Sequence, residues 1–149
     1  MAAVPEKLND TLESLDLIAD RSERIQTLID ISSRFEEVPP RLARRPFPEE
    51  NKVPACESEA YVFGEVRPDG TLDFHFAVEN PQGISAKAMA VLLDTLSGAP
   101  PEQVAEIDQD IVYRVFGREL SMGKSMGLMG MVSMVKNMAR KFAESREGR

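Results

Sequence analysis

The side chain best suited to covalent chemistry in this sequence is its single cysteine, Cys56. It follows Pro54 and precedes an alternating stretch that begins at Ala60, so we expect it in a loop and not on an apolar helix or strand face. Loops held by rigid elements often carry functional residues. A cysteine thiolate is a nucleophile, but a lone cysteine is more commonly an inert, buried, small apolar residue. Its position alone leaves both interpretations open.

Few other residues offer reactive or metal-binding chemistry. His75 is the only histidine, and it lies on the strand face opposite Phe74 and Phe76. We therefore expect a surface or lightly hydrogen-bonded histidine and not a catalytic base. A zinc site needs several converging ligands, and the sequence has no cysteine pair and no Cys–His spacing. We expect neither a bound metal nor a cofactor.

Glycines and methionines recur near the C-terminus without a known ligand-binding motif. Gly123, Gly127 and Gly130 lack the spacing of a phosphate-binding loop, so we expect them to allow close backbone packing. Methionine is flexible and apolar, and core packing together with a partner-facing surface explains the methionines more simply than copper binding. They are Met122, Met126, Met129, Met131, Met134 and Met138.

Hydrophobic periodicity predicts the helices that would position the cysteine loop. Caps, prolines and glycines at the ends of the apolar stretches mark their boundaries. The expected helices are a short one through Leu8, Leu12 and Leu15; a second capped by Asp20 and Glu23 with a face of Ile25, Leu28, Ile29, Ser32 and Phe35; one from Ile84 to Leu96; a short stretch that begins at Pro100 and Pro101 and runs through Ile107, followed by the apolar positions Ile111, Val112, Val115 and Phe116 and ended by Gly117; and a long one from about Ser125 to Ala143.

A β-hairpin is predicted between the two sets of helices. Residues 60–66 and 72–78 alternate in character, and a Pro-Asp-Gly turn at residues 68–70 joins them. The order is helices, hairpin, helices, which favours an α+β fold over a parallel βαβ protein. The chain length of 149 residues suits a single domain, residues 1–149.

A proline-rich loop precedes the cysteine. Residues 38–48 contain four prolines, which favour extended backbone, and three arginines, Arg41, Arg44 and Arg45. We interpret it as a solvated basic loop, and a docking role stays open.

Composition restricts the class of protein further. Hydrophobic residues make up 42% and charged residues 29% of the chain, as in ordinary soluble domains. The net charge of −7 argues against nucleic-acid binding, which depends on neutralising phosphates. No apolar stretch approaches membrane-spanning length, the N-terminus lacks a signal-peptide core, and a single cysteine forms no internal disulfide. We therefore expect a cytoplasmic protein with neither a nucleic-acid nor a membrane partner.

The residues around Cys56 carry a resemblance to a known family. The run Asn51-Lys52-Val53-Pro54-Ala55-Cys56-Glu57-Ser58 is similar to the pattern Asn-x-Val-x-Gly-Cys-x-Ser of SufE-type sulfur acceptors. The resemblance covers roughly residues 20–141, and two later segments continue it in the family's order. They are Ser97-Gly98-Ala99-Pro100-Pro101-Glu102 and Leu120-Ser121-Met122-Gly123-Lys124-Ser125-Met126-Gly127-Leu128.

Four positions depart from the family pattern. Ala55 stands for the usual Gly, Glu59 for Gln, Tyr61 for Trp and Lys124 for Arg. The last change is not neutral, because a guanidinium offers a planar fork of donors and an ammonium acts as a point charge. Lys124 is still the residue that the resemblance places in the family's basic position, where we expect it to stabilise the thiolate or persulfide.

The resemblance implies a persulfide carrier with no enzyme or cofactor chemistry of its own. Cys56 would accept sulfur from a SufS-type cysteine desulfurase, stimulate that enzyme and deliver the sulfur to a downstream iron–sulfur scaffold. Lys52 also lies close to Cys56 in sequence, while Glu57 and Glu59 would oppose a thiolate. The implied fold is a small antiparallel sheet covered by helices, shared with IscU-type scaffolds.

Other functions stay open at this point. A scaffold normally supplies three cysteines, and one cysteine argues against that role. A single-cysteine thiol peroxidase or hydrolase would need His75 to reach Cys56. A non-catalytic interaction protein would leave Cys56 inert.

Overall fold

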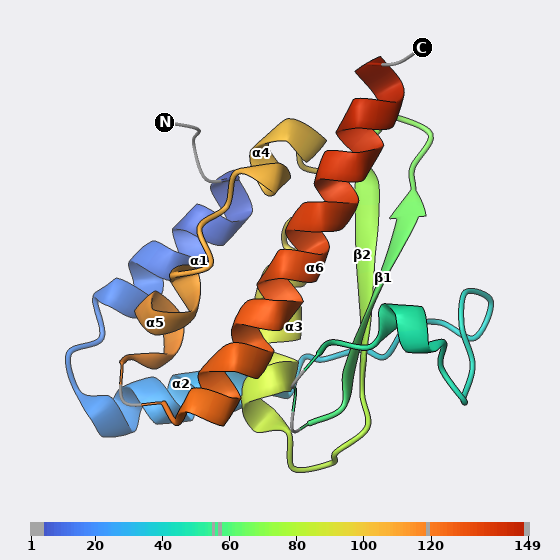
Figure 1. Ribbon diagram of the computed structural model, residues 1–149. Helices are drawn as coiled ribbons and strands as arrows, with labels where there is room; N and C mark the ends of the chain where they lie inside the picture. Colours follow the sequence, from blue (N-terminus) through green and yellow to red (C-terminus); the bar gives the residue numbers. More distant parts are fainter. Residues whose placement is uncertain (1–4, 55, 57, 119, 148–149) are drawn as a thin grey trace.

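The computed structural model describes residues 5–54, 56, 58–118 and 120–147. Helices precede and follow one hairpin, so the predicted α+β architecture is confirmed (Figure 1). In order, the elements are α1 (Glu6–Asp16), α2 (Arg21–Ser32), the 3₁₀ helix η1 (Glu49–Asn51), β1 (Ala60–Val66), β2 (Leu72–Val78), α3 (Ile84–Asp94), α4 (Pro101–Ala105), α5 (Ile111–Phe116) and α6 (Met122–Glu147).

The two strands pair antiparallel, with Ala60 opposite Val78 and Val66 opposite Leu72. The predicted turn is present, and Gly70 adopts a φ of 85°, a left-handed conformation that glycine accepts without steric cost. An isolated two-stranded hairpin is marginally stable in water, so this sheet depends on what covers its faces.

Both faces of the hairpin are covered. Figure 1 shows α6 and α3 lying beside the strands, and contacts link both helices to the sheet. On this side Phe74 and Phe76 enter the main core, together with Leu8, Leu12 and Leu15 of α1, as their spacing predicted. On the other side, strand residues pack with two residues of the proline-rich loop in a small second cluster. It consists of Val38, Phe47, Tyr61, Phe63 and Ala77.

The structure changes the expected face of α2. The cap is confirmed, because the Asp20 carboxylate accepts a hydrogen bond from the Glu23 amide at 3.1 Å. The helix ends at Ser32, before Phe35, and Ile25 and Ile29 are 49% and 39% exposed. Apolar periodicity identifies a stripe, but it does not tell a core stripe from one that lines an open groove. Of the expected face, Leu28 and Ser32 are buried, Ile25 and Ile29 are partly exposed, and Phe35 lies beyond the end of the helix.

The arginines of the proline-rich loop are exposed, as expected of a solvated loop, and two of them are also paired. Arg41 forms a two-pronged ion pair with Glu65 of β1. Arg45 binds Glu37 and also Glu79, at 2.8 Å. These pairs hold the loop against the hairpin. Two of its three arginines are therefore neutralised by carboxylates of the same chain.

The remaining helices follow the predictions with shifted ends. Gly117, at a φ of 83°, ends α5, and α3 stops at Asp94, two residues before the expected end. The last helix is longer than expected at both ends, from Met122 to Glu147. Among the described helices, none combines the length and apolarity that a bilayer-spanning helix requires.

Candidate functional site at Cys56

Cys56 lies in a short loop whose two ends are hydrogen-bonded to each other. The Val53 amide donates to the Ala60 carbonyl at 2.8 Å, and the Glu59 amide donates to the Cys56 carbonyl at 3.1 Å. Glu59 has a φ of 50°, an unusual left-handed conformation for a non-glycine residue. These hydrogen bonds hold the segment that carries Cys56 against the start of β1.

Neighbouring segments hold this loop in place. The Asn80 amide donates to the Ser58 carbonyl at 3.2 Å, and the Asn51 side chain donates to the Val62 carbonyl at 2.9 Å. Asn51 is part of the sequence pattern that carried the family resemblance, and this hydrogen bond gives it a structural role. The loop is thus attached to β1 and to the segment that follows β2.

Two glycines of α6 let the loop approach the helix closely. A Cβ atom on Gly127 would lie 3.0 Å from the Cys56 Cα and 3.4 Å from its Sγ. A Cβ atom on Gly130 would lie 2.8 Å from a Val53 methyl carbon. The prediction that these glycines allow close backbone packing is confirmed for both.

A pocket of about 220 Å³ opens beside the thiol of Cys56. This volume suits a few heavy atoms and not a drug-sized ligand. Three segments form it: the cysteine loop, the start of α3 and the first turns of α6. Its lining residues are Cys56, Ser58, Gln82, Gly83, Ile84, Ser85, Ala86, Gly123, Lys124, Gly127 and Leu128.

Positively charged and partially positive groups line the pocket. The N-terminal turns of α3 and α6 both contribute to its wall, and helix N-termini carry partial positive charge. Lys124 adds a full positive charge at the same place.

The structure brings together both residues that we assigned to the site, because Cys56 and Lys124 line the same pocket. Their chemical roles stay predictions. Lys52 is not among the described lining residues and instead forms a β-bridge with Tyr61. Glu59 is at the base of the loop and does not line the pocket, and Glu57 lies outside the described residues.

Sequence reasoning missed the wall that α3 contributes. Gln82, Ile84 and Ser85 reach the pocket only because the N-terminus of α3 folds back beside the cysteine loop. The one available signal was the interruption of the alternating pattern at residues 80–83. It predicted the start of a helix but not which segment packs beside that start.

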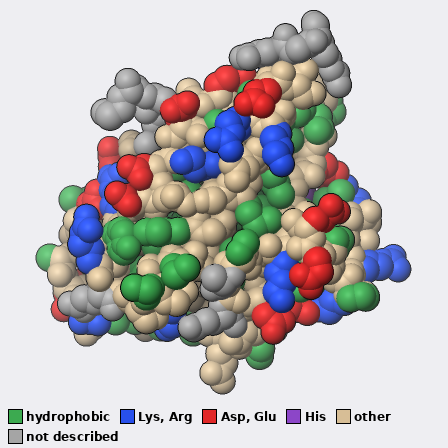
Figure 2. Space-filling view, viewed as in Figure 1, with side chains coloured by type: hydrophobic (Ala, Val, Ile, Leu, Met, Phe, Trp, Pro, Cys, Tyr) green, Lys and Arg blue, Asp and Glu red, His purple; other side chains and the backbone are tan. Residues whose placement is uncertain are grey.

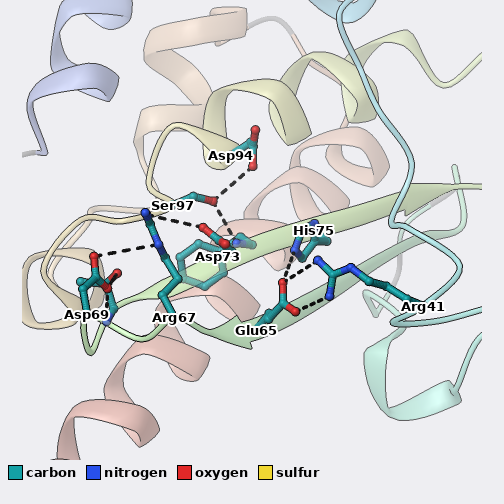
Figure 3. Close-up of polar contacts among 10 residues, drawn as sticks. Arg41, Glu65, Arg67, Asp69, Asp73, His75, Asp94 and Ser97 are labelled. Atoms are coloured by element: carbon teal, nitrogen blue, oxygen red, sulfur yellow. Dashed lines mark hydrogen bonds and ion pairs between the residues drawn. The ribbon is translucent and has the colours of Figure 1, made fainter.

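His75 belongs to a different part of the molecule. It pairs with Phe63 in the hairpin, and its Nε2 atom lies 3.3 Å from Glu65 (Figure 3). Figure 3 shows Arg41 and His75 both pointing toward this glutamate. The expectation of a lightly hydrogen-bonded histidine is confirmed. His75 does not line the Cys56 pocket, which argues against a base for a peroxidase or hydrolase.

Glu65, Asp73 and His75 form the one described group whose ligand atoms lie within 4.8 Å of one another, a spacing that a metal ion could bridge. Arg41 forms an ion pair with the Glu65 carboxylate, and the Arg67 guanidinium lies 3.6 Å from the Asp73 carboxylate (Figure 3). Hydrogen bonds from Arg41, and secondarily from His75, lower the pKa of Glu65 to about 2. The carboxylates therefore already have cationic partners within the chain.

The methionines divide between core and surface, as predicted. Met131 is fully buried, while Met122 and Met126 are 78% and 52% exposed in the first turns of α6. Figure 2 shows hydrophobic side chains gathered on the face where α5 and the lower part of α6 lie. An apolar surface thus lies close to the cysteine pocket.

Comparison with known proteins identifies the family. The model of the SufE family, described as an Fe-S metabolism associated domain, matches residues 9–139. This match spans most of the chain, which therefore belongs to the SufE family and is linked to iron–sulfur metabolism. The predicted resemblance is confirmed.

The fold is also found among solved structures. The chain is similar to a hypothetical protein from Thermus thermophilus determined in solution, with 25% identity and a TM-score of 0.74. The alignment covers 95% of this chain and 99% of that chain. No curated protein sequence matches the chain.

Proposed function

We propose that this protein accepts sulfane sulfur on Cys56 from the persulfide of a SufS-type cysteine desulfurase, stimulates that enzyme, and passes the sulfur to an iron–sulfur scaffold. The observation that carries the proposal is the position of Cys56 in an anchored loop, beside a small pocket lined by Lys124 and by two helix N-termini. Membership in a family linked to iron–sulfur metabolism supports the same role.

The transfer is a thiol exchange at sulfur. The Cys56 thiolate attacks the outer sulfur of the donor persulfide, a new S–S bond forms, and the S–S bond of the donor breaks. The donor cysteine leaves as a thiolate, and the proton of the persulfide moves with the outer sulfur. The outer sulfur keeps its oxidation level, so the step needs no added oxidant or reductant.

The pocket supports this step in two ways. It has room for the added sulfur atom and is too small for a large substrate, which suits a cargo that remains covalently attached. Its positive charge would stabilise the attacking thiolate, and also the persulfide on Cys56 once that group loses its proton. Because Cys56 is the only cysteine, no internal thiol can attack the persulfide and release sulfide.

Intact-protein mass spectrometry tests the proposal. The protein is incubated with the cysteine desulfurase of the same organism and with cysteine, and the Cys56→Ser variant serves as the control. We expect a gain of about 32 Da that a reductant reverses and that the variant does not show. No gain with a desulfurase that is active on its own would contradict the proposal and favour a simple interaction protein.

A further inference from the structure

A second hollow adjoins the cysteine pocket. It is a groove of about 620 Å³ between α2, the start of α3 and the segment that joins α5 to α6. Figure 1 shows these three regions meeting at the lower end of the molecule. Ile25 and Ile29 of α2 and Ile84 of α3 line it, and all three are more than a third exposed. Exposed β-branched residues gathered along one groove are typical of an interaction site.

The charge of this groove is opposite to that of the whole chain. The sequence has 25 acidic and 18 basic residues, yet the described lining includes four cations and no carboxylate. The cations are Arg21, Arg24, Arg118 and Lys124. Arg24 is used within the fold, because it donates to the backbone carbonyls of Leu15, Arg114 and Val115. The groove therefore suits a ligand that carries both apolar side chains and carboxylates.

The groove and the cysteine pocket are continuous. Ile84, Ser85 and Lys124 line both of them. A partner segment lying in the groove would therefore extend to within reach of Cys56. The Lys124 ammonium has no side-chain partner among the described residues. It can therefore pair with an anionic group in either the pocket or the groove.

We propose that this groove is the docking site for an amphipathic, acidic helical segment of the sulfur donor, and that it positions the donor persulfide over Cys56. This inference rests on the proposed function. The apolar wall of the groove, Ile25, Ile29 and Ile84, lies on α2 and α3 and offers side chains and no open strand edge, so we expect a helix in the groove and not strand addition. Apolar anchors would contact Ile25, Ile29 and Ile84, and flanking carboxylates would face Arg118 and Lys124.

A direct binding measurement tests the inference without relying on sulfur transfer. Binding of the cysteine desulfurase of the same organism is measured by fluorescence anisotropy on labelled desulfurase. Ile29→Glu and Arg118→Glu are each expected to raise the Kd about tenfold or more, since each places a carboxylate in the docking site. Val66→Glu and Arg140→Glu are the matched controls, because each places a glutamate at an exposed position outside the groove. They should leave the Kd within about twofold.

The outcomes separate this inference from the proposed function. A higher Kd in the groove variants alone supports the groove as the docking site, even if no sulfur reaches Cys56 in the mass measurement. Equal effects of groove and control variants, or no binding of the desulfurase to the unchanged protein, overturn the inference. Self-association that Ile29→Glu abolishes, with desulfurase binding unaffected, also overturns it by showing a second copy as the occupant.

Discussion

Cys56 acquires its proposed reactivity from neighbours that are distant in sequence. Gly127 removes a side chain that would otherwise contact the cysteine, and Lys124, three residues earlier on the same helix, lines the same pocket. Positions three apart lie on the same side of a helix, so one turn of α6 supplies both the space and the charge. Family resemblance pointed to Lys124, and periodicity alone could not have placed it beside Cys56.

Removing the charge of Lys124 should slow the chemistry of Cys56. We expect Lys124→Ala to lower the rate of Cys56 alkylation by iodoacetamide about threefold at neutral pH, because a nearby cation stabilises the thiolate. Lys124→Arg should retain most of the rate. Lys136→Ala on the same helix is the matched control, and an equal loss in that variant would show that the effect is not local.

At the scale of elements, the fold positions the site through segments whose packing only the structure reveals. The helix of Leu8, Leu12 and Leu15, the hairpin and the Gly117 stop were predictable, because each depends on a local pattern. The surroundings of the α2 face could not be predicted, since Ile25 and Ile29 follow the same helical period whether they contact the core or line a groove. The pairing of Arg41 with Glu65 joins residues far apart in sequence, and no local rule specifies it.

The ion pair between Arg41 and Glu65 should give the protein an acid-side pH dependence. The pKa of Glu65 is lowered from 4.5 to about 2, so its contribution to stability is present above about pH 4.5 and is lost as the pH falls toward 2. We expect Arg41→Gln to reduce the loss of stability between pH 6 and pH 3, measured as the shift of the urea midpoint.

The same loop offers the control for this measurement. Arg44→Gln removes an exposed loop arginine for which no ion pair is found among the described residues. It should leave the pH dependence as it is in the unchanged protein. If the two variants behave alike, the ion pair with Glu65 does not link the loop to the stability of the hairpin.

The whole molecule depends on a core shared by the hairpin and the helices. Phe74 is 1% exposed on the face of β2 that packs against the helices, and its amide donates to the Ser97 hydroxyl at 2.9 Å. The hairpin and the helices should therefore unfold together, because neither buries its apolar face alone. The cysteine loop, attached to β1 and to the segment after β2, should lose its structure in the same transition.

A core substitution tests this coupling. We expect Phe74→Ala to lower the free energy of unfolding by about 3–5 kcal/mol, the usual cost of removing a buried phenylalanine side chain. His75→Ala, one residue along on the partly exposed face, should cost less than about 1 kcal/mol. Circular dichroism and alkylation of Cys56 in urea should report the same midpoint. Separate midpoints would show that the loop opens independently of the core.

The presence of a single cysteine has a consequence for stoichiometry under the proposed function. With one acceptor thiol, each chain delivers one sulfur atom per visit to a scaffold. Even a [2Fe–2S] cluster contains two inorganic sulfides, so its assembly would need about two deliveries by this route. The number of loaded carriers that reach a scaffold in a given time would then set the upper limit on the rate of cluster formation.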